Sequence, residues 1–203
     1  MSQTLPETHR SPGRPREFDI DAALDKAVRV FRERGYHATS IGDLSEAMQL
    51  AAGSIYKAFK DKRAVFLAAF DRYSTQRSAQ VRAAAAGTDS GRERLRRVLA
   101  SYLEASQGIE GRRGCLVVGS TIELAALDDD VAARVSAALK ANEALLAGLI
   151  REGQTDGSIS AHVNPAATAR LLVCMTQGMR VVGKAKTPLP SAALLDVAMK
   201  LVA

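Results

Sequence analysis

Hydroxyl-bearing and basic side chains recur at close spacing in one stretch of this sequence. They are Thr39, Ser40, Ser54, Tyr56, Lys57 and Lys62. Hydroxyl and ammonium groups bind phosphate oxygens, and so do the backbone N–H groups at a helix N-terminus. Gly53 precedes Ser54 and has no side chain, so the backbone there can approach a partner closely. This stretch therefore favours contact with the phosphates and base edges of a nucleic acid.

A first helix is predicted from about Asp19 to Arg34, ahead of this stretch. Its apolar residues recur at helical spacing, at Ile20, Leu24, Ala27, Val28 and Phe31. Gly35 follows, where a left-handed residue suits the end of a helix. The first helix therefore has an apolar face to pack on the elements that follow.

Two short helices and the start of a long one are predicted next. Thr39 or Ser40 caps the second helix, which ends at a break at residues 49–50. The third helix carries residues 53–59, and Asp61 opens the fourth. Three short helices with a brief turn between the second and third form a helix-turn-helix, the unit that reads a DNA major groove.

The order of residues in this unit is more specific than the helix pattern. Phe31-x-x-x-Gly35-Tyr36-x-x-Thr39-Ser40-Ile41-x-x-Leu44 leads through Ala47 to Gly53-Ser54-Ile55-Tyr56-Lys57-Ala58-Phe59-x-x-Lys62. Over residues 18–70 this string resembles the N-terminal domain of the tetracycline-repressor (TetR) family. Gly114-Cys115-Leu116 is similar to one subgroup of that family. The resemblance implies a DNA-binding transcriptional regulator whose third helix enters the major groove.

The resemblance also implies roles for individual residues. Ser54 and Lys57 point towards base edges or phosphates. Phosphate contacts fall to Thr39, Ser40, Tyr56 and Lys62. Taken singly, Tyr56 is equally well explained as a core aromatic, and the two lysines as solvated charges. The ordered string favours DNA binding for all of them.

The sequence departs from the family pattern at two positions. The usual turn glycine is Gln49, and the usual serine cap of the third helix is Ala51. A missing N-cap typically costs about 1 kcal/mol. Base contacts from Ala51 and Ala52 must be apolar, for instance with a thymine methyl group.

Residues 1–17 form a basic arm that is predicted to be flexible. The arm contains Gly13-Arg14-Pro15-Arg16. Two arginines around a proline that keeps the chain extended suit a narrow A·T minor groove. Arg14 and Arg16 are therefore expected either to contact DNA there or to belong to a merely soluble basic tail.

The rest of the chain is also expected to be helical, which gives an all-α fold of about nine helices. The later helices are expected near residues 90–107, 114–127, 128–152, 165–183 and 191–202. We expect the arm at 1–17, the helix-turn-helix DNA-binding domain at 18–62, and a ligand-binding and dimerisation domain at 63–203.

By resemblance, the last two helices pair with the same helices of a second subunit in a homodimer. Two apolar stripes suit this role: Leu171, Leu172, Met175, Met179 and Val182, and Leu194, Leu195, Ala198, Leu201 and Val202.

A small-molecule effector is expected to bind among the helices between residues 61 and 152. No aromatic residue follows Tyr102 in the sequence, so an aliphatic pocket edged by Tyr73, Tyr102, Glu123 and Gln177 is predicted. Glu123 lies in an apolar run, and a buried carboxylate needs a partner. That partner is either a ligand cation or one of Arg112, Arg113 and Lys140.

Cys115 is a further candidate for the ligand site. It follows Arg112-Arg113-Gly114, and positive charge together with a helix N-terminus favours a thiolate. The residue is therefore either a sensor of electrophiles or oxidants, or an inert buried thiol.

Composition excludes several classes of protein. No metal-ligand cluster, phosphate-binding loop or nucleophile elbow is present, so neither an enzyme nor a cofactor is expected. No apolar run is long enough to span a membrane, and two distant cysteines fit the reducing cytoplasm. The net charge of +6 is too modest for a protein that coats nucleic acid without specificity.

The expected function is a repressor that binds palindromic double-stranded operator DNA as a dimer. A small molecule is expected to release it from the operator. An activator of the same fold is the alternative.

Overall fold

The computed structural model describes residues 19–203, so Arg14 and Arg16 of the basic arm lie outside the described residues. Residues 19–203 contain ten α-helices, one 3-10 helix and no strand. The helices are α1 Ile20–Arg34, α2 Ile41–Met48, α3 Ala52–Ala58, α4 Lys62–Ala85, α5 Gly91–Ala105, α6 Gly108–Arg113, α7 Leu116–Glu123, α8 Asp129–Thr155, α9 Pro165–Lys184, α10 Ser191–Met199 and the 3-10 helix Lys200–Val202. The predicted all-α class is confirmed. The expected helices are present, and the short α6 is an addition to them.

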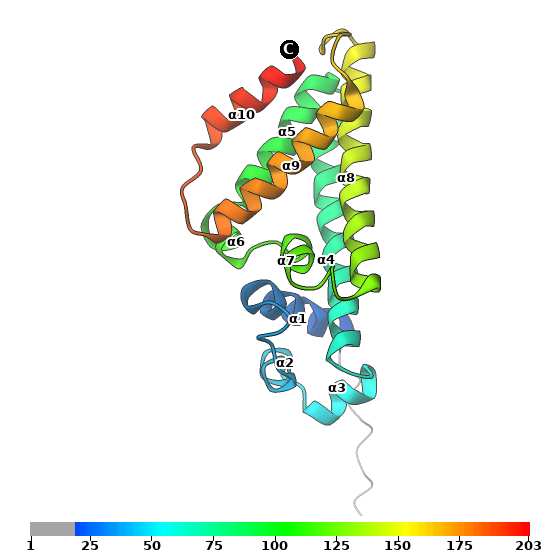
Figure 1. Cartoon of the computed structure of the whole chain (residues 1–203), viewed down its shortest axis with the longest axis vertical. Helices are drawn as coiled ribbons and strands as arrows, with labels where there is room; N and C mark the ends of the chain where they lie inside the picture. Colours follow the sequence, from blue (N-terminus) through cyan, green and yellow to red (C-terminus); the bar gives the residue numbers. More distant parts are fainter. Residues whose placement is uncertain (1–18) are drawn as a thin grey trace, which may run out of the picture.

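The helices α1, α2 and α3 form the helix-turn-helix at one end of the molecule (Figure 1). The side chain of Asp19 accepts the N–H groups of Asp21 and Ala22 at the start of α1. Ser40 begins α2 in a capping box with Asp43, in which each side chain accepts the backbone N–H of the other residue. These bonds satisfy N–H groups that have no partner within the helix, and so they fix where α1 and α2 begin.

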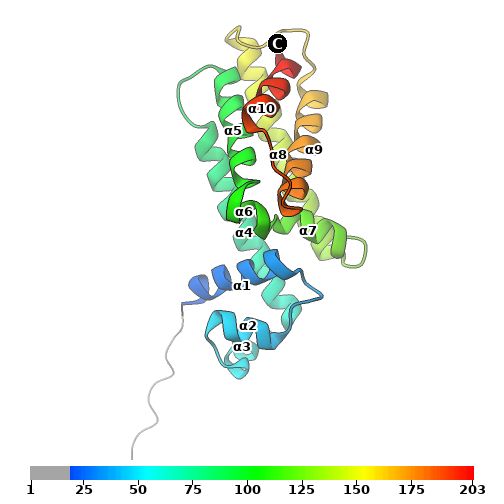
Figure 2. The same ribbon diagram turned by 90° about the vertical axis from the view of Figure 1, so that its left-hand side faces the viewer.

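The long helix α4 connects the helix-turn-helix to the rest of the molecule (Figures 1 and 2). Near its start the buried ring of Phe66 meets Phe31 of α1 edge to face, with centroids 5.1 Å apart. The ring of Tyr36 lies 5.0 Å from the same phenylalanine. Aromatic pairs of this kind contribute about 0.5–1.5 kcal/mol beyond their buried area. This aromatic core fixes α1 on α4.

The larger part of the molecule is a bundle in which α4, α5, α8 and α9 pack side by side (Figure 2). Its core consists mainly of aliphatic side chains that are almost completely buried, including Leu95, Leu99, Leu103, Leu149, Ile150 and Leu172. The last helix, α10, covers α5. A second core, built around Phe31 and Phe66, extends from α1 and α4 to Leu116 of α7. The bundle and the helix-turn-helix are therefore joined by packed side chains.

The short helices α6 and α7 lie where the bundle meets α1 (Figure 2). Gly114 ends α6 with a φ of 85°, a conformation that side chains other than glycine rarely adopt. Residues 124–127 turn back towards α8. For these reasons α7 spans only Leu116–Glu123 of the single helix expected near residues 114–127.

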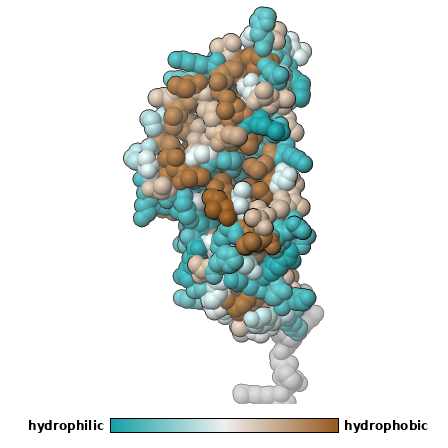
Figure 3. Space-filling view, in the orientation of Figure 1, coloured by the Kyte–Doolittle hydropathy of each residue, from teal (hydrophilic) through white to brown (hydrophobic). Residues whose placement is uncertain are grey.

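Half of the residues in the apolar stripes predicted on the last two helices are buried within the single chain. The buried members are Leu172, Met179, Leu195, Ala198 and Val202. The exposed apolar row includes the stripe residues Leu171 and Leu201 but is otherwise different: it consists of Leu171, Cys174, Gly178 and Val181 on α9, Val197 on α10 and Leu201 on the 3-10 helix. Figure 3 shows apolar side chains on this half of the surface. Five of the ten stripe residues are therefore buried within the single chain, because helical spacing alone does not distinguish a face that packs inside the chain from a face at its surface.

Candidate DNA-binding surface and effector site

The third helix, α3, has one buried face and one exposed face. Ile55 is fully buried in the core of the helix-turn-helix, and α3 packs against α2. Ser54 is half-buried, whereas Tyr56 is 53% exposed and Lys57 is also exposed. A Cβ atom added at Gly53 would meet nothing within 4 Å. The helix therefore presents a phenol and an ammonium group beside open backbone.

The turn before α3 differs from the usual form of such turns. Gln49 has φ 58° and ψ 41°, the left-handed conformation that glycine adopts most easily. Its side-chain oxygen accepts a hydrogen bond of 2.9 Å from Nζ of Lys26. Ala51 occupies the N-cap of α3 and offers no side-chain bond, and both Ala51 and Ala52 are exposed. The two departures noted in the sequence thus correspond to a strained turn and an uncapped helix.

The hydroxyl groups of Thr39 and Ser40 hold the start of α2. Thr39 is only 1% exposed, and its hydroxyl donates to the carbonyl of Gly35 at 2.6 Å. The expectation that this hydroxyl meets a phosphate does not fit its burial. Ser40 is exposed, and its Oγ accepts the N–H of Asp43 at 3.1 Å. Of this pair, only Ser40 lies at the surface.

Lys62 is engaged with the turn between α1 and α2. Its Nζ donates to the carbonyls of Tyr36 and Thr39 at 3.0 and 2.9 Å. The same atom lies 4.3 Å from the centroid of the Tyr36 ring, a cation–π contact. The side chain predicted to contact phosphate therefore braces the turn that precedes α2.

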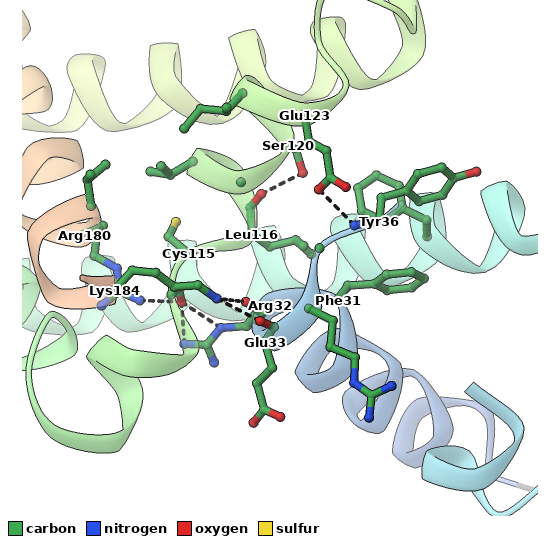
Figure 4. Close-up of a pocket in the computed structure, with 18 residues that line it drawn as sticks. Phe31, Arg32, Glu33, Tyr36, Cys115, Leu116, Ser120, Glu123, Arg180 and Lys184 are labelled. Atoms are coloured by element: carbon green, nitrogen blue, oxygen red, sulfur yellow. Dashed lines mark hydrogen bonds between the residues drawn. The ribbon is translucent and has the colours of Figure 1, made fainter. Parts of the chain in front are cut away.

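A cavity of about 370 Å³ lies between the helix-turn-helix and the bundle. Figure 4 shows this junction cavity, whose wall includes Phe31, Arg32, Cys115, Leu116, Glu123, Arg180 and Lys184. Ligand pockets typically enclose about 300–1,000 Å³. The pocket was expected among the helices at residues 61–152. The junction cavity also takes wall residues from α1 and α9, whereas a second cavity of about 520 Å³ is lined by residues 70–142 alone, within the expected range.

Glu123 connects α7 to the turn that follows α1 (Figure 4). Its carboxylate accepts the backbone N–H groups of Tyr36 and His37 at 2.9 and 2.6 Å. The predicted protein partners Arg112, Arg113 and Lys140 were wrong, because two backbone N–H groups bind this carboxylate instead. Charge patterns in a sequence do not reveal backbone N–H groups.

Three cationic side chains gather at the other end of the cavity. The carbonyl of Gly114 accepts Nε and Nη2 of Arg32 at 2.9 and 2.8 Å, and Nη2 of Arg180 at 2.8 Å. Nζ of Lys184 donates to the carbonyls of Arg32 and Glu33 at 2.6 and 3.1 Å. Cations at the C-terminus of a helix stabilise its unpaired carbonyls, so Lys184 anchors the end of α1 to α9.

The cluster of Arg32, Arg180 and Lys184 was not predicted from the sequence as part of a site. The one signal was Arg180, which interrupts an otherwise apolar run in α9. A charged residue in such a run is either exposed or specifically paired. Arg180 is only 4% exposed, so it is a buried cation of the candidate site.

Cys115 and Tyr73 meet at the edge of the junction cavity. Cys115 is half-buried at the N-cap of α7, and its Sγ accepts the hydroxyl of Tyr73 at 3.4 Å. Burial raises the pKa of Tyr73 far above its ordinary value, so the phenol keeps its proton and acts as the donor. Of the predicted ligand residues, Cys115 and Glu123 line the cavity, and Tyr73 supports Cys115 from behind.

The other two predicted ligand residues lie elsewhere. Tyr102 is buried in the core of the bundle, where burial raises the pKa of its hydroxyl to about 12. Its ring lies 4.7 Å from the guanidinium carbon of Arg77. Gln177 on α9 is half-buried and donates weakly to Thr176 at 3.5 Å. Neither residue belongs to the wall of the junction cavity.

Residues 19–203 contain neither a metal site nor a membrane-spanning helix. In that part of the chain, no group of three or more His, Cys, Asp or Glu side chains is placed to hold a metal ion. None of the helices described there has the length and apolar character needed to cross a bilayer. The two candidate sites for DNA and effector are the surface of α3 and the junction cavity.

Two family models match the chain over its two halves. The model described as "Bacterial regulatory proteins, tetR family" matches residues 23–69. The model described as "Tetracyclin repressor-like, C-terminal domain" matches residues 91–190. The first range contains the helix-turn-helix, and the second begins at α5 and contains the wall residues of α7 and α9.

Individual relatives agree with these models. The chain is 32% identical to the HTH-type transcriptional repressor ComR of Escherichia coli (strain K12), over 85% of this chain and 82% of that protein. It is 30% identical to the transcriptional regulator AcuR of Cereibacter sphaeroides, over 83% and 81%. A solved structure of the TetR family transcriptional regulator CifR with 26-base-pair double-strand operator DNA matches with a TM-score of 0.83 and 30% identity, over 94% of this chain and 100% of CifR. The chain therefore belongs to the tetR family of bacterial transcriptional regulators.

Proposed function

We propose that this regulator is a repressor that binds a two-fold symmetric operator as a homodimer in the cytoplasm and is released by a small molecule. The exposed face of α3, with Tyr56 and Lys57, is the observation that carries the proposal. Its relatives ComR, a repressor, and CifR, which was solved with operator DNA, support it. Residues 1–17 serve as the arm, 18–62 as the DNA-binding domain and 63–203 as the ligand-binding and dimerisation domain. The chemistry is binding alone, without a cofactor.

The surface of α3 supplies the contacts in the major groove. Tyr56 donates its hydroxyl to a phosphate, and Lys57 reaches a phosphate or a guanine edge. Gly53 and Ser54 lie where the backbone approaches DNA most closely. The methyl groups of Ala51 and Ala52, which are exposed, suit thymine methyl groups.

Three further groups support these contacts. Ser40 and the N-terminal amides of α2 meet phosphate, because this helix end lies at the surface. Thr39 and Lys62 act by holding the turn before α2, through the carbonyls of Gly35 and Tyr36. Arg14 and Arg16 occupy the adjacent minor groove.

A homodimer places two α3 helices on one face. The proposed contact is the exposed row on α9, α10 and the 3-10 helix, which contains Leu171, Val181, Val197 and Leu201. These four residues are between 38% and 57% exposed in the single chain, although they are apolar. In a two-fold symmetric dimer the same apolar patch of each subunit packs against that of the other, so both patches are buried from water.

The effector enters the junction cavity and contacts Cys115 and Glu123. The cavity is lined by both the helix-turn-helix and the bundle. An effector that binds more tightly at one separation of these two parts shifts the equilibrium towards the conformation that has that separation. In the effector-bound conformation α1 and α4 spread the two α3 helices. Their separation then no longer matches successive major grooves, and operator affinity falls.

Selection of duplexes from a random DNA pool by the full chain tests this function. The expected product is a two-fold symmetric site with half-sites about 34–36 Å apart or a multiple of that spacing. Affinity for the selected site should exceed affinity for random DNA by at least about a thousandfold. Recovery of no common sequence, with equal affinity for random DNA, would overturn the proposal.

A further inference from the structure

We propose that the junction cavity recognises an anionic effector, a carboxylate on an apolar chain, and that Arg180 is its receptor. This inference rests on the proposed effector response and specifies the chemical class of the effector. It is carried by a buried guanidinium with a free donor, by the excess of positive charge around it, and by the apolar surface beside it.

Arg180 is buried with one donor group unused. The side chain is 4% exposed, and its Nη2 is bound to the carbonyl of Gly114 at 2.8 Å. Its Nη1 is buried without a hydrogen-bond partner, and none of the carboxylates in residues 19–203 forms an ion pair with this guanidinium. A buried donor that lacks an acceptor costs about 1–3 kcal/mol, and more when it is charged. A ligand carboxylate at Nη1 removes that cost.

The surroundings of Arg180 carry an excess of positive charge. Arg32 shares the carbonyl of Gly114 with it, and Lys184 lies at the same end of the cavity. Within residues 19–203, the one carboxylate paired with Arg32 is that of Glu110, at 3.0 Å, and Glu110 is shared with Arg113, so the positive charge still exceeds the negative charge. Desolvation by burial lowers the pKa of Lys184, and the nearby charge of Arg32 lowers it further. Both effects favour an anion here, because an anion offsets the charge of all three groups.

The acidic groups of the cavity wall are already occupied. Glu123 accepts the N–H groups that follow Gly35, at the opposite end of the cavity. Glu33 accepts from Arg29 and Arg113 at 3.1 and 3.3 Å. Neither carboxylate of the cavity wall is therefore left to serve Arg180.

The start of α7 adds a second anion-binding feature beside Arg180. Cys115 at the N-cap provides no side-chain bond to the first turn, whose N–H groups have no partners within the helix. Such a helix end attracts negative charge, and here it accompanies the unpartnered guanidinium. The remaining wall is apolar, with Phe31, Leu116 and Val118 among its members. This combination fits a carboxylate head with an aliphatic tail.

An anion in this position weakens the hold of the bundle on α1. Arg32 lies on α1, and its guanidinium now donates to Gly114 in the loop before α7. Lys184 on α9 holds the last carbonyls of α1. A carboxylate competes with these carbonyls for both cations, since charged hydrogen bonds are stronger than those to neutral acceptors. Binding is thereby coupled to the position of the helix-turn-helix.

Calorimetry with three eight-carbon probes on the full chain tests the inference. Octanoate, 1-octanol and octylamine share one tail and differ in charge. Wild-type protein should bind octanoate at least about tenfold more tightly than octanol, a difference of about 1.4 kcal/mol, and octylamine more weakly still. Equal binding of octanoate and octanol, stronger binding of octylamine, or no binding of octanoate overturns the proposal.

Two variants localise the preference. Arg180→Gln should bind octanoate and octanol equally, whereas Arg170→Gln, which removes an exposed charge from the same helix, should keep the wild-type preference. A preference that survives in a folded Arg180→Gln overturns the assignment. If that variant does not fold, Arg180→Lys and the wild-type comparison of the three probes decide, with the preference expected in both.

Operator binding measured in the same samples separates this inference from the proposed function. If octylamine or octanol releases operator DNA and octanoate does not, the effector response stands and the anion site is wrong. If the chain binds no specific operator, the proposed function fails, and calorimetry still decides whether the cavity selects an anion.

Discussion

The carboxylate of Glu123 on α7 accepts the backbone N–H groups of Tyr36 and His37 in the turn between α1 and α2, at 2.9 and 2.6 Å. A Cβ atom at Gly35 would lie only 2.7 Å from one oxygen of this carboxylate. The φ of Gly35 is 86°, so both its backbone conformation and its lack of a side chain permit the contact. A side chain of the cavity wall thus reaches the turn that leads to the DNA-binding helices.

Replacing Glu123 with Gln should loosen this connection. The amide keeps one acceptor oxygen but loses the charge that strengthens both bonds, so a loss of about 1 kcal/mol in unfolding free energy is expected. The effector should also release DNA less completely, because a movement of α7 would no longer be transmitted to the turn between α1 and α2. Chemical denaturation and operator titrations with and without effector measure the two effects.

Glu104→Gln is the matched control, since Glu104 is exposed on α5, away from the cavity wall. It should leave both measurements unchanged. Wild-type stability together with full effector response in Glu123→Gln would show that this contact does not transmit the signal.

A hydroxyl at the start of α3 should stabilise the protein. Ala51 occupies the N-cap without a side-chain bond, so Ala51→Ser supplies the missing acceptor and should add about 1 kcal/mol to the unfolding free energy. Ala58→Ser, at the exposed other end of α3, tests whether a hydroxyl alone is enough, and no gain is expected there. Equal effects of the two substitutions in thermal or chemical unfolding would contradict the capping explanation.

The pair Arg63–Asp128 joins α4 to the start of α8 and makes stability depend on pH. Hydrogen bonds from Arg63 at 2.6 and 2.8 Å lower the pKa of Asp128 to about 2. A carboxyl whose pKa is lower in the folded state contributes stability above its ordinary pKa, and that contribution is lost as the pH falls through the folded value. Asp128→Asn should therefore be less stable than wild type at pH 7, with a difference that narrows below about pH 4 and is lost only below about pH 2.

Asparagine also caps helices well, so this substitution removes charge and largely preserves the N-cap of α8. Asp129→Asn, at the exposed neighbouring position, is the control and should show a smaller difference. A difference between wild type and Asp128→Asn that stays constant from neutral to acid pH would refute the electrostatic explanation.

The exposed row on α9, α10 and the 3-10 helix should control dimer formation. Val197 is 57% exposed in the single chain, so Val197→Asp is tolerated by the fold but places a charge in the proposed interface. A monomer in analytical ultracentrifugation and loss of tight operator binding are expected. Leu127→Asp changes a residue that is 78% exposed outside this row and should remain a dimer. Dimers of normal stability in Val197→Asp would place the interface elsewhere.

Local signals in the sequence predicted most of the fold. Asp19, Ser40, Asp61 and Asn164 cap helices as their types suggest, and Gly35 ends α1 with a positive φ. The six-residue helix α6 was not expected, because its sequence Gly108-Ile109-Glu110-Gly111-Arg112-Arg113 has too few turns to show an apolar period.

The candidate site was less predictable, because its partners are distant in the sequence and many are backbone groups. Glu123 binds N–H groups of a turn 87 residues away, and Arg180 binds a carbonyl 66 residues away. Thr39 fits the family string, yet its hydroxyl is turned inward to Gly35. Residue types predict what a side chain can bind, but only the packing of α1, α7 and α9 determines which group it meets.

The affinity of the full chain for its selected operator, measured by fluorescence anisotropy over a range of salt concentrations, tests the central claim that the exposed face of α3 contacts DNA. The double substitution Tyr56→Phe and Lys57→Met should lower affinity about a hundredfold, or about 2.7 kcal/mol, and reduce the slope of log affinity against log salt by about 1. Lys140→Met, which removes one exposed charge from α8, should leave affinity and slope unchanged. A double variant that binds as tightly as wild type, with the same slope, would contradict the account.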